Sequence, residues 1–364
     1  MQGVGPAACR RERAGARLPR RSLPPGSVEL SALELRDVVV EYERRGLDPV
    51  RAVAGVSLEV ERGQIVGLVG ESGCGKSTLA RAAVGMVAPL AGTIRFEGRE
   101  VGSLTRGARP RELTRLQMVF QNPFSSLNPR RRVGEQIRDA LAVLGLVPRP
   151  RRAGRVRQLL EQVGLPAGAA RGYPHEFSGG QRQRVAIARA LAASPSVIVL
   201  DEPLASLDAS AQAQIANLLV TLTRELELGL LLISHDLAIV RHVADVVAVM
   251  YLGRIAEAGP THQLWATPLH PYTEALIGAV PHADGAGTLP EALPGEVPDP
   301  SRPPSGCRFH PRCPYAFERC PREEPALVEL APGRSAACWL QRPGEALAPP
   351  ADKASRLAPV ATAE

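Results

Sequence analysis

The sequence predicts an α/β fold in which a largely parallel sheet is covered by helices on both faces. First, short apolar runs alternate with helical patterns along the chain. Second, the stretch 70–78 fits the pattern G-x-x-x-x-G-K-[ST] of a phosphate-binding loop between a buried strand and a helix. Third, the apolar run 197–200 ends in Asp201 and Glu202, which is typical of the strand that holds Mg²⁺ in phosphate-loop nucleotidases.

The elements can be placed in order from apolar periodicity and turn residues. Strands are expected at 33–42, 53–60, 64–69, 92–98 (as an edge strand), 116–120, 197–200 and 230–233, with a hairpin at 246–259. Helices are expected at 79–87, 133–143, 153–163, 177–192, 210–227, 261–266 and 271–279. The region 116–192 is predicted to be a mostly helical insertion, and the proline-rich tail from 281 is predicted to be irregular.

Composition sets the broad class. Of 364 residues, 45% are hydrophobic and 22% charged, as in soluble globular proteins. No run approaches the roughly 18 apolar residues of a membrane-spanning helix, and the N-terminal arginines are not followed by the apolar segment of a signal peptide. We therefore expect a cytoplasmic protein with one large domain and an appendage, or two domains.

The net charge of +7 is concentrated at one end of the chain. Residues 1–28 hold six arginines against one glutamate, so this arm is expected to be a disordered basic tail that is solvated or touches anionic lipid. Aromatic residues make up only 4% of the chain, which argues against a surface that stacks nucleic-acid bases.

The phosphate-binding loop has a clear chemical logic. Its glycines let the backbone wrap a triphosphate at a helix N-terminus, where the dipole favours an anion. The chain holds 44 lysines and arginines, yet lysine occurs only at Lys76 and Lys353. A compact ammonium fits inside a phosphate cradle where a planar guanidinium does not. The predicted nucleotide-binding residues are Gly70, Glu71, Ser72, Gly73, Cys74, Gly75, Lys76, Ser77 and Thr78.

These motifs occur in one order that resembles the ATP-binding cassette family of transport ATPases. Besides the loop, they are Gln121, the signature 177–181, the pair Asp201-Glu202, and His235. The resemblance covers about residues 33–340 and implies a RecA-like phosphate-loop core with an antiparallel β subdomain and a helical subdomain. It also implies four segments: a basic arm at 1–28, the cassette at 29–265, an irregular cysteine-containing extension at 266–340, and a disordered tail at 341–364.

The resemblance also assigns roles in ATP hydrolysis with Mg²⁺. It implies that Ser77, Gln121 and Asp201 hold the metal. Glu202 would act as general base, and His235 would contact the γ-phosphate.

Two further residues match family positions. Tyr42 matches the adenine-stacking aromatic, although a core role is the alternative. Asp208 matches the D-loop acid, in a sequence where Ala205 and Ser206 stand in swapped order.

The signature motif consists of Phe177, Ser178, Gly179, Gly180 and Gln181. A serine and two glycines opening a helix form a second anion site, although the phosphate loop already cradles the same triphosphate. In the family, the signature of one cassette closes over the nucleotide of another. The resemblance thus implies a second ATPase subunit, and we expect this one not to be identical.

Several stretches look like the oligopeptide, dipeptide and nickel import branch. They are 120–129, Tyr173-Pro174-His175, His270-Pro271-Tyr272-Thr273 and the cysteine-bearing tail, and Ser126–Arg130 resembles the second of the branch's two cassettes. The branch implies import of a peptide or related solute, with two membrane permease subunits, an extracytoplasmic binding protein, and a peripheral position on the cytoplasmic face of the inner membrane. The segment 122–135 would face a permease.

Two other functions were weighed. A soluble cassette protein acting on nucleic acid or ribosomes usually carries two cassettes or a coiled coil, and neither is present here. A regulator without turnover would lack the catalytic carboxylate, whereas Glu202 is present.

The tail holds four clustered cysteines, Cys307, Cys313, Cys320 and Cys338. In a cytosolic protein such a cluster indicates a metal or cluster rather than disulfides. The spacing is not that of a zinc ribbon. Because related cassettes carry an iron–sulfur cluster on such cysteines, the resemblance favours a cluster, with zinc or free thiols as the alternatives.

Overall fold

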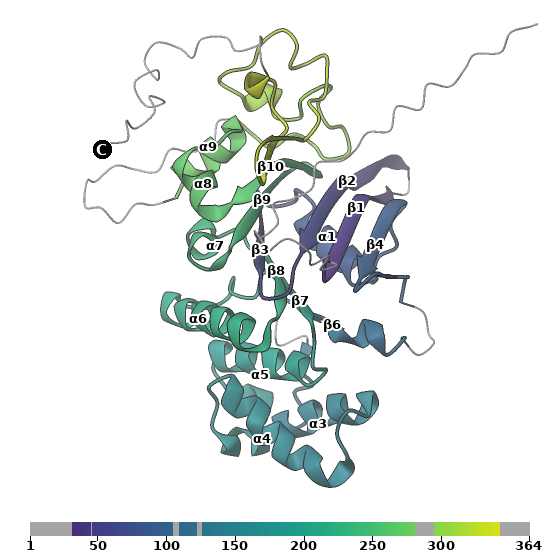
Figure 1. Ribbon diagram of the computed structural model, residues 1–364, viewed down its shortest axis with the longest axis vertical. Coiled ribbons are helices and arrows are strands. Elements are labelled where there is room, and N and C mark those ends of the chain that lie inside the picture. The colour runs from purple at the N-terminus through teal and green to yellow at the C-terminus, as the bar shows by residue number, and fades with distance from the viewer. Residues whose placement is uncertain (1–30, 45, 105–108, 122–125, 281–294, 343–364) are drawn as a thin grey trace, which may run out of the picture.

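The computed structural model describes residues 31–44, 46–104, 109–121, 126–280 and 295–342. The predicted basic arm, part of the 122–135 segment and nearly all of the predicted disordered tail lie outside these ranges. The described chain forms two sheets with helices around them (Figure 1). Within these ranges, no helix combines the length and apolar character needed to cross a bilayer.

The smaller sheet is antiparallel and contains four strands in the order β2-β1-β4-β5. These strands are β1 (Leu33–Arg44), β2 (Leu47–Val60), β4 (Ala91–Phe96) and β5 (Arg99–Glu100). The sequence-based edge position of 92–98 was wrong, because β4 pairs with β1 on one side and with β5 on the other. This sheet is the expected antiparallel β subdomain.

The larger sheet has eight strands in the order β11-β12-β10-β9-β3-β8-β7-β6. Its strands are β3 (Ile65–Val69), β6 (Leu116–Val119), β7 (Val197–Asp201), β8 (Gly229–Ile233), β9 (Val246–Tyr251), β10 (Arg254–Pro260), β11 (Val328–Ala331) and β12 (Arg334–Ala336). The strands β6, β7, β8, β3 and β9 are parallel, as predicted, and β10 turns back antiparallel.

Two expectations about this sheet need correction. The tail beyond 281 is not wholly irregular, because β12 pairs with β10 and β11 pairs with β12, which carries the sheet into the extension. In addition, β6 pairs with β7 as the last strand at one edge of the sheet, so the start of the predicted helical insertion belongs to the main sheet. The strands β11 and β12 are only four and three residues long, and such short strands give little periodicity to detect.

The helices lie close to where the sequence placed them, and α7 was not foreseen. They are α1 (Lys76–Ala83), α3 (Val133–Leu144), α4 (Arg152–Gln162), α5 (Gly179–Leu191), α6 (Ala209–Leu226), α7 (Leu237–Val243), α8 (Thr261–Ala266) and α9 (Pro271–Gly278). Short 3-10 turns occupy Glu112–Arg115, Arg149–Arg151, Ala167–Arg171, Pro174–Glu176, His310–Arg312 and Trp339–Gln341.

The central strands feed two separate hydrophobic cores because successive side chains point to opposite faces of a sheet. In β3, Val66 and Leu68 face the core shared with α1 and the antiparallel sheet, whereas Ile65 and Val69 face the core under the other helices. Helices α3, α4 and α5 gather at one end of the molecule, and the C-terminal extension lies at the opposite end (Figure 1).

Candidate nucleotide-binding and catalytic site

The phosphate loop runs from the end of β3 into α1, as predicted. Its backbone requires glycine at two positions. Gly70 has a φ of 150°, and a Cβ added there would lie 2.1 Å from the Met250 carbonyl oxygen. Gly75 has a φ of 106°, and a Cβ added there would lie 2.0 Å from the Ala52 carbonyl oxygen. Any side chain at either position would collide with backbone, so the loop is shaped by contacts as well as by its own turns.

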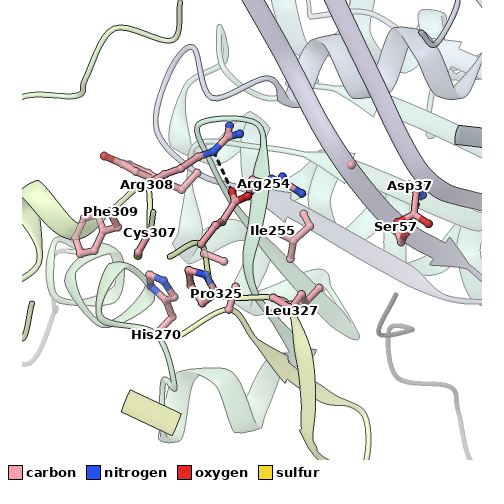
Figure 2. A pocket seen from close by; sticks show the side chains of 16 residues that line it. Asp37, Ser57, Arg254, Ile255, His270, Cys307, Arg308, Phe309, Pro325 and Leu327 are labelled. Carbon is pink, nitrogen blue, oxygen red and sulfur yellow. Dashed lines mark hydrogen bonds and ion pairs between the residues drawn. The ribbon is translucent and has the colours of Figure 1, made fainter. Parts of the chain in front are cut away.

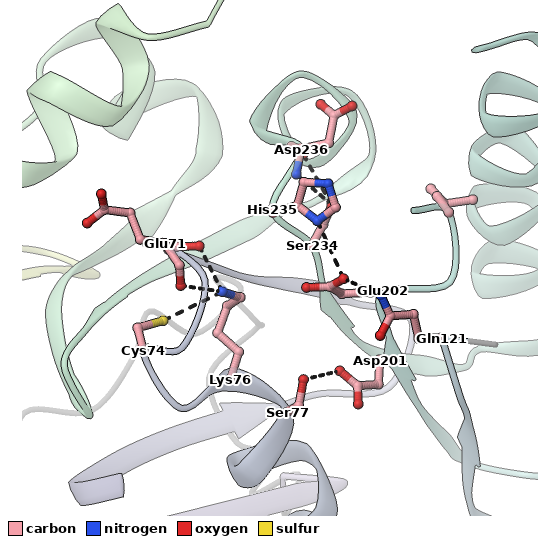
Figure 3. Close-up of polar contacts among 12 residues, drawn as sticks. Glu71, Cys74, Lys76, Ser77, Gln121, Asp201, Glu202, Ser234, His235 and Asp236 are labelled. Atoms are coloured by element: carbon pink, nitrogen blue, oxygen red, sulfur yellow. Dashed lines mark hydrogen bonds and ion pairs between the residues drawn. The ribbon is translucent and has the colours of Figure 1, made fainter. Parts of the chain in front are cut away.

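Lys76 lies inside this loop, with only 4% of its surface exposed. Its ammonium donates hydrogen bonds of 2.8 Å to the carbonyl oxygens of Gly70 and Glu71 and lies 3.6 Å from the Cys74 sulfur (Figure 3). Burial raises the pKa of the Cys74 thiol. The lysine is thus held within the loop by main-chain oxygens, as a phosphate-binding lysine requires.

The expected metal-binding oxygens meet where α1 begins and β7 ends. The Ser77 hydroxyl donates a hydrogen bond of 2.7 Å to the Asp201 carboxylate. Burial raises the pKa of Asp201, opposed by this hydrogen bond. A hydroxyl and a carboxylate are oxygen ligands of the kind that Mg²⁺ prefers. Gln121, the third expected ligand, lies after β6 and instead donates through its amide nitrogen to Glu202, at 2.9 Å.

Glu202 and His235 are brought together by neighbouring parallel strands. The carboxylate of Glu202 lies 3.5 Å from the His235 Nδ1 atom (Figure 3). Glu202 has a φ of 48°, and its backbone N–H donates a 3.0 Å hydrogen bond to the Ile233 carbonyl. A non-glycine residue in this left-handed region is uncommon, and such backbone is concentrated at functional sites. The polar groups therefore lie at the carboxyl ends of β6, β7 and β8, where α/β sheets bind ligands.

Tyr42 lies on β1 near the same loop. It is 38% exposed, and its hydroxyl lies 3.5 Å from the Thr78 Oγ1 atom. The core alternative for this residue was therefore wrong, because a core tyrosine would be covered. Its adenine-stacking role stays a prediction.

The signature residues open α5. Ser178 accepts a hydrogen bond from the Gln181 backbone, and the Gln181 side chain accepts one from the Ser178 backbone, which is a complete capping box. Ser178 and Gln181 are exposed. Added Cβ atoms at Gly179 and Gly180 would lie 3.1 Å from Leu207 and 3.2 Å from Ala211. The signature is thus a preformed, accessible helix N-terminus packed against the D-loop and α6.

Asp208 caps α6 through a 2.9 Å hydrogen bond from the Ala211 backbone to its carboxylate. This is a local structural role that the sequence had not assigned. Its role as the D-loop acid is a separate expectation.

The four tail cysteines come together at one small cavity, which Cys307, Cys313, Cys320 and Cys338 line with His310 and Trp339. They are free thiols, and burial raises the pKa of Cys313 and Cys338 to about 12. Among the residues that the structure describes, no group of three or more His, Cys, Asp or Glu side chains is arranged to hold a metal ion. The structure therefore gives no support to the expected iron–sulfur cluster or zinc.

A larger pocket lies between the antiparallel sheet, β10 and the extension (Figure 2). Asp37 and Ser57 contribute from one side, and Cys307 and Phe309 from the other. The Arg254 guanidinium crosses it and pairs with Glu324 at 2.8 Å. None of the expected nucleotide-binding residues lines this pocket.

Sequence reasoning assigned no role to two residues that contact the phosphate loop, or to a third that contacts one of them. Tyr272 and Arg312 hold Glu71, and Tyr251 contacts Arg312. Tyr272 lies in a motif that had been noted for its family resemblance. Nothing local marks Arg312, because its partner is 241 residues away.

A phosphate loop with a buried lysine, a strand-end Asp-Glu pair, a facing histidine and a separate capped signature helix define a phosphate-loop ATPase of the ATP-binding cassette type. Comparison with known proteins agrees. Residues 53–205 match the family described as ABC transporter, and residues 256–320 match the family described as oligopeptide/dipeptide transporter, C-terminal region.

Relatives share most of their length with this chain. The di/tripeptide transport ATP-binding protein DppF of Pseudomonas aeruginosa is 49% identical, covering 85% of this chain and 97% of the relative. The oligopeptide transport ATP-binding protein AppF of Bacillus subtilis is 44% identical, with coverage of 85% and 97%. The chain belongs to the ATP-binding subunits of ABC transporters, in the group that carries the oligopeptide/dipeptide transporter C-terminal region. It is therefore an ATPase that uses ATP and Mg²⁺.

Solved structures show the same cassette. The cbiO1 protein of Clostridium perfringens, described as part of the ABC transporter complex cbiONQ, is 29% identical with a TM-score of 0.58, over 65% of this chain and 92% of that one. The cassette MJ0796, solved as a dimer bound to ADP and Pi, is 27% identical with a TM-score of 0.55, over 63% and 98%.

Proposed function

We propose that this chain powers the import of peptides, dipeptides or oligopeptides, through a membrane permease. The observation that carries the proposal is the 49% identity over nearly the whole length of a di/tripeptide transport ATP-binding protein, together with the matching C-terminal region. The alternative, a soluble cassette protein acting on nucleic acid or ribosomes, has no such support.

The site supports a specific division of labour. Ser77 and Asp201 would hold Mg²⁺, with Gln121 as the third expected ligand, and the ion would neutralise charge on the phosphates. Lys76 donates to the phosphate oxygens and the loop backbone orients them. Glu202 polarises the attacking water, and His235 keeps that water and the carboxylate in line. Gln121 already contacts Glu202 at 2.9 Å, so it orients the same carboxylate.

The partners follow from the exposed signature. The segment Ser178 to Gln181 presents a capped helix N-terminus. Within the described residues, no hydrogen bond joins this segment to the phosphate loop of the same chain. We propose that it closes over the nucleotide of a second, non-identical cassette. Two permease subunits and an extracytoplasmic solute-binding protein complete the assembly, with this chain peripheral on the cytoplasmic face of the inner membrane.

The four cysteines remain a separate proposal. The family resemblance is what motivates an iron–sulfur cluster or zinc here; the four cysteines line one cavity, but among the described residues they are not arranged as a ligand set. Measuring the iron, sulfide and zinc content of protein purified without oxygen distinguishes an iron–sulfur cluster, a zinc site and free thiols. Absence of all three elements would leave thiols as the answer.

The function is tested by reconstituting the chain with its co-encoded cassette, permeases and binding protein in proteoliposomes. ATP-dependent uptake of a labelled dipeptide or oligopeptide is expected. Glu202→Gln should lower ATP hydrolysis at least about hundredfold while ATP still binds, because the general base is lost but the phosphate contacts remain.

The exposed Glu225→Gln on α6 is the matched control and should hydrolyse ATP normally. Hydrolysis without peptide uptake, but stimulated by RNA or ribosomes, would overturn the import proposal in favour of the alternative. Full turnover by Glu202→Gln would remove the assigned base.

A further inference from the structure

The C-terminal extension contacts the phosphate loop through one buried ion pair. Arg312 lies at the end of the 3-10 turn His310–Arg312, and its guanidinium donates two hydrogen bonds, of 2.7 and 3.0 Å, to the two carboxylate oxygens of Glu71. The Arg312 side chain is 3% exposed and that of Glu71 18%. A two-bond fork of this kind is the strong and geometrically specific form of an arginine–carboxylate contact.

Aromatic residues from three elements fix this ion pair. Tyr251 from β9 accepts a 3.3 Å hydrogen bond from Arg312. The guanidinium lies 5.8 Å from the ring centres of Tyr251 and Phe309. Tyr251, Tyr272 and Phe309 pack with ring centres 4.6 to 5.3 Å apart. The arginine therefore has little freedom to leave Glu71.

Every polar group of Glu71 is engaged in this arrangement. Its backbone N–H donates to the Tyr272 hydroxyl at 2.9 Å, and its carbonyl accepts from the Lys76 ammonium at 2.8 Å. Its carboxylate is held by Arg312. Glu71, whose carbonyl contacts the phosphate-binding lysine, is thus held by two residues from outside the residues 53–205 that match the ABC transporter family.

Charge gives the contact a consequence for ligand binding. Glu71 places a negative charge within a loop that must accept a polyanion, and like charges at short range oppose each other. Arg312 compensates that charge from the protein side. Without it, the loop would carry an unpaired negative charge.

We propose that Arg312 and Tyr272 are positioning residues for nucleotide binding: they fix the Glu71 peptide and cancel its charge, so that the affinity of the phosphate loop for ATP depends on the C-terminal extension. The inference goes beyond the ATPase assignment and does not depend on the transported solute. It makes the extension a part of the nucleotide site rather than an appendage.

The test is equilibrium binding of MgATP to the full-length chain, with the unfolding midpoint measured in the absence of nucleotide. Arg312→Gln should weaken ATP binding about tenfold or more, since a contact to a charged group is lost and Glu71 is left unpaired. The double variant Glu71→Gln with Arg312→Gln should return to within about threefold of the unmodified chain, because the uncompensated charge is gone.

Two further variants separate charge from fold. Arg312→Lys keeps the charge without the fork and should lose less affinity than Arg312→Gln. Arg254→Gln removes another ion pair between β10 and the extension, with Glu324 at 2.8 Å, that does not touch the loop. It should bind ATP like the unmodified chain.

Unchanged ATP affinity in a folded Arg312→Gln chain would overturn the proposal. So would failure of the Glu71→Gln change to restore affinity, because a merely structural role for Arg312 predicts no rescue. If Arg312→Gln does not fold, Tyr272→Phe decides, since it keeps the buried ring and removes only the hydroxyl. A three- to tenfold loss of affinity supports the proposal, and no loss overturns it.

Discussion

At the scale of single residues, the proposed catalytic and metal-binding groups contact one another within the chain. Ser77 bonds Asp201, Gln121 bonds Glu202, and Glu202 faces His235. The strained backbone at Glu202, with φ of 48°, aims its carboxylate at the two neighbouring strands. These contacts fix the relative positions of the side chains from three neighbouring strands and α1.

Lys76 gives the sharpest prediction at this scale. Lys76→Ala should weaken ATP binding at least tenfold, because a buried charge-assisted donor to the phosphates is lost. Lys76→Arg should recover little of that loss, since the 4% exposed ammonium has a cradle sized for a compact head group. Both are measured as ATP binding by the full-length chain, with the exposed Arg241→Lys on α7 as control. Full affinity in Lys76→Arg would contradict the cradle argument.

At the scale of elements, helix starts carry much of the site. Ser178 caps α5, Asp208 caps α6 and His270 caps α9. The first two were visible in the sequence as motif residues, and their capping function follows from their residue types. His270 is unusual because a buried neutral imidazole does the work, with its Nδ1 atom accepting from the Tyr272 backbone at 3.0 Å.

The cap of α9 should make folding stability depend on pH. Burial lowers the pKa of His270 to about 4, against the opposing hydrogen bond to the Ala337 backbone. Between about pH 6.5 and 4 the unfolded chain therefore binds a proton that the folded chain does not, so stability falls as pH falls through this window. His270 should contribute a loss of about 2 to 3 kcal/mol between pH 7 and 4.5.

Urea unfolding at pH 7 and pH 4.5 measures this loss. His270→Asn keeps an oxygen that can accept from the Tyr272 backbone but cannot titrate, so its stability should fall less on acidification. The exposed His175 offers a matched control as His175→Asn, whose pH dependence should follow the unmodified chain. Equal pH dependence in all three proteins would show that His270 is not the titrating group.

At the scale of the whole molecule, the C-terminal extension completes the cassette. It adds β12 to the main sheet beside β10, lays a buried Arg334 against the fully buried Glu257 at 3.0 Å, and reaches the phosphate loop through Arg312. The carboxylate of Glu257 also accepts hydrogen bonds from the backbones of Leu269 and His270. The predicted domain boundary between residues 265 and 266 therefore falls within a region whose two sides are joined by hydrogen bonds and an ion pair.

We therefore expect the full chain to unfold in one cooperative transition that includes the extension. Arg334→Gln should lower the free energy of unfolding by about 3 kcal/mol, because it leaves Glu257 charged and buried without its partner. Arg322→Gln, whose partner Glu318 is exposed, should change it by less than about 0.5 kcal/mol. Two separate transitions, with Arg334→Gln affecting only one, would show that the extension folds as its own domain.

Much of the fold and most residues of the candidate site could be predicted, because the relevant signals are local. Apolar runs gave the parallel strands, and the polar residues that follow them gave Asp201, Glu202 and His235. The errors about the sheets share one cause. Strand order depends on which distant segments pair with one another, and the sequence of a single segment does not specify its partner. This applies to the edge assignment of β4, the place of β6, and the strands β11 and β12.

By itself, the sequence determined which residues are expected to touch the nucleotide, since phosphate-loop chemistry demands fixed residue types at fixed spacing. Only the tertiary structure decided what holds them. The Glu71–Arg312 pair spans 241 residues, four dispersed cysteines meet at one cavity, and Tyr42 is exposed rather than in the core. These are consequences of packing between separate elements, which local pattern does not encode.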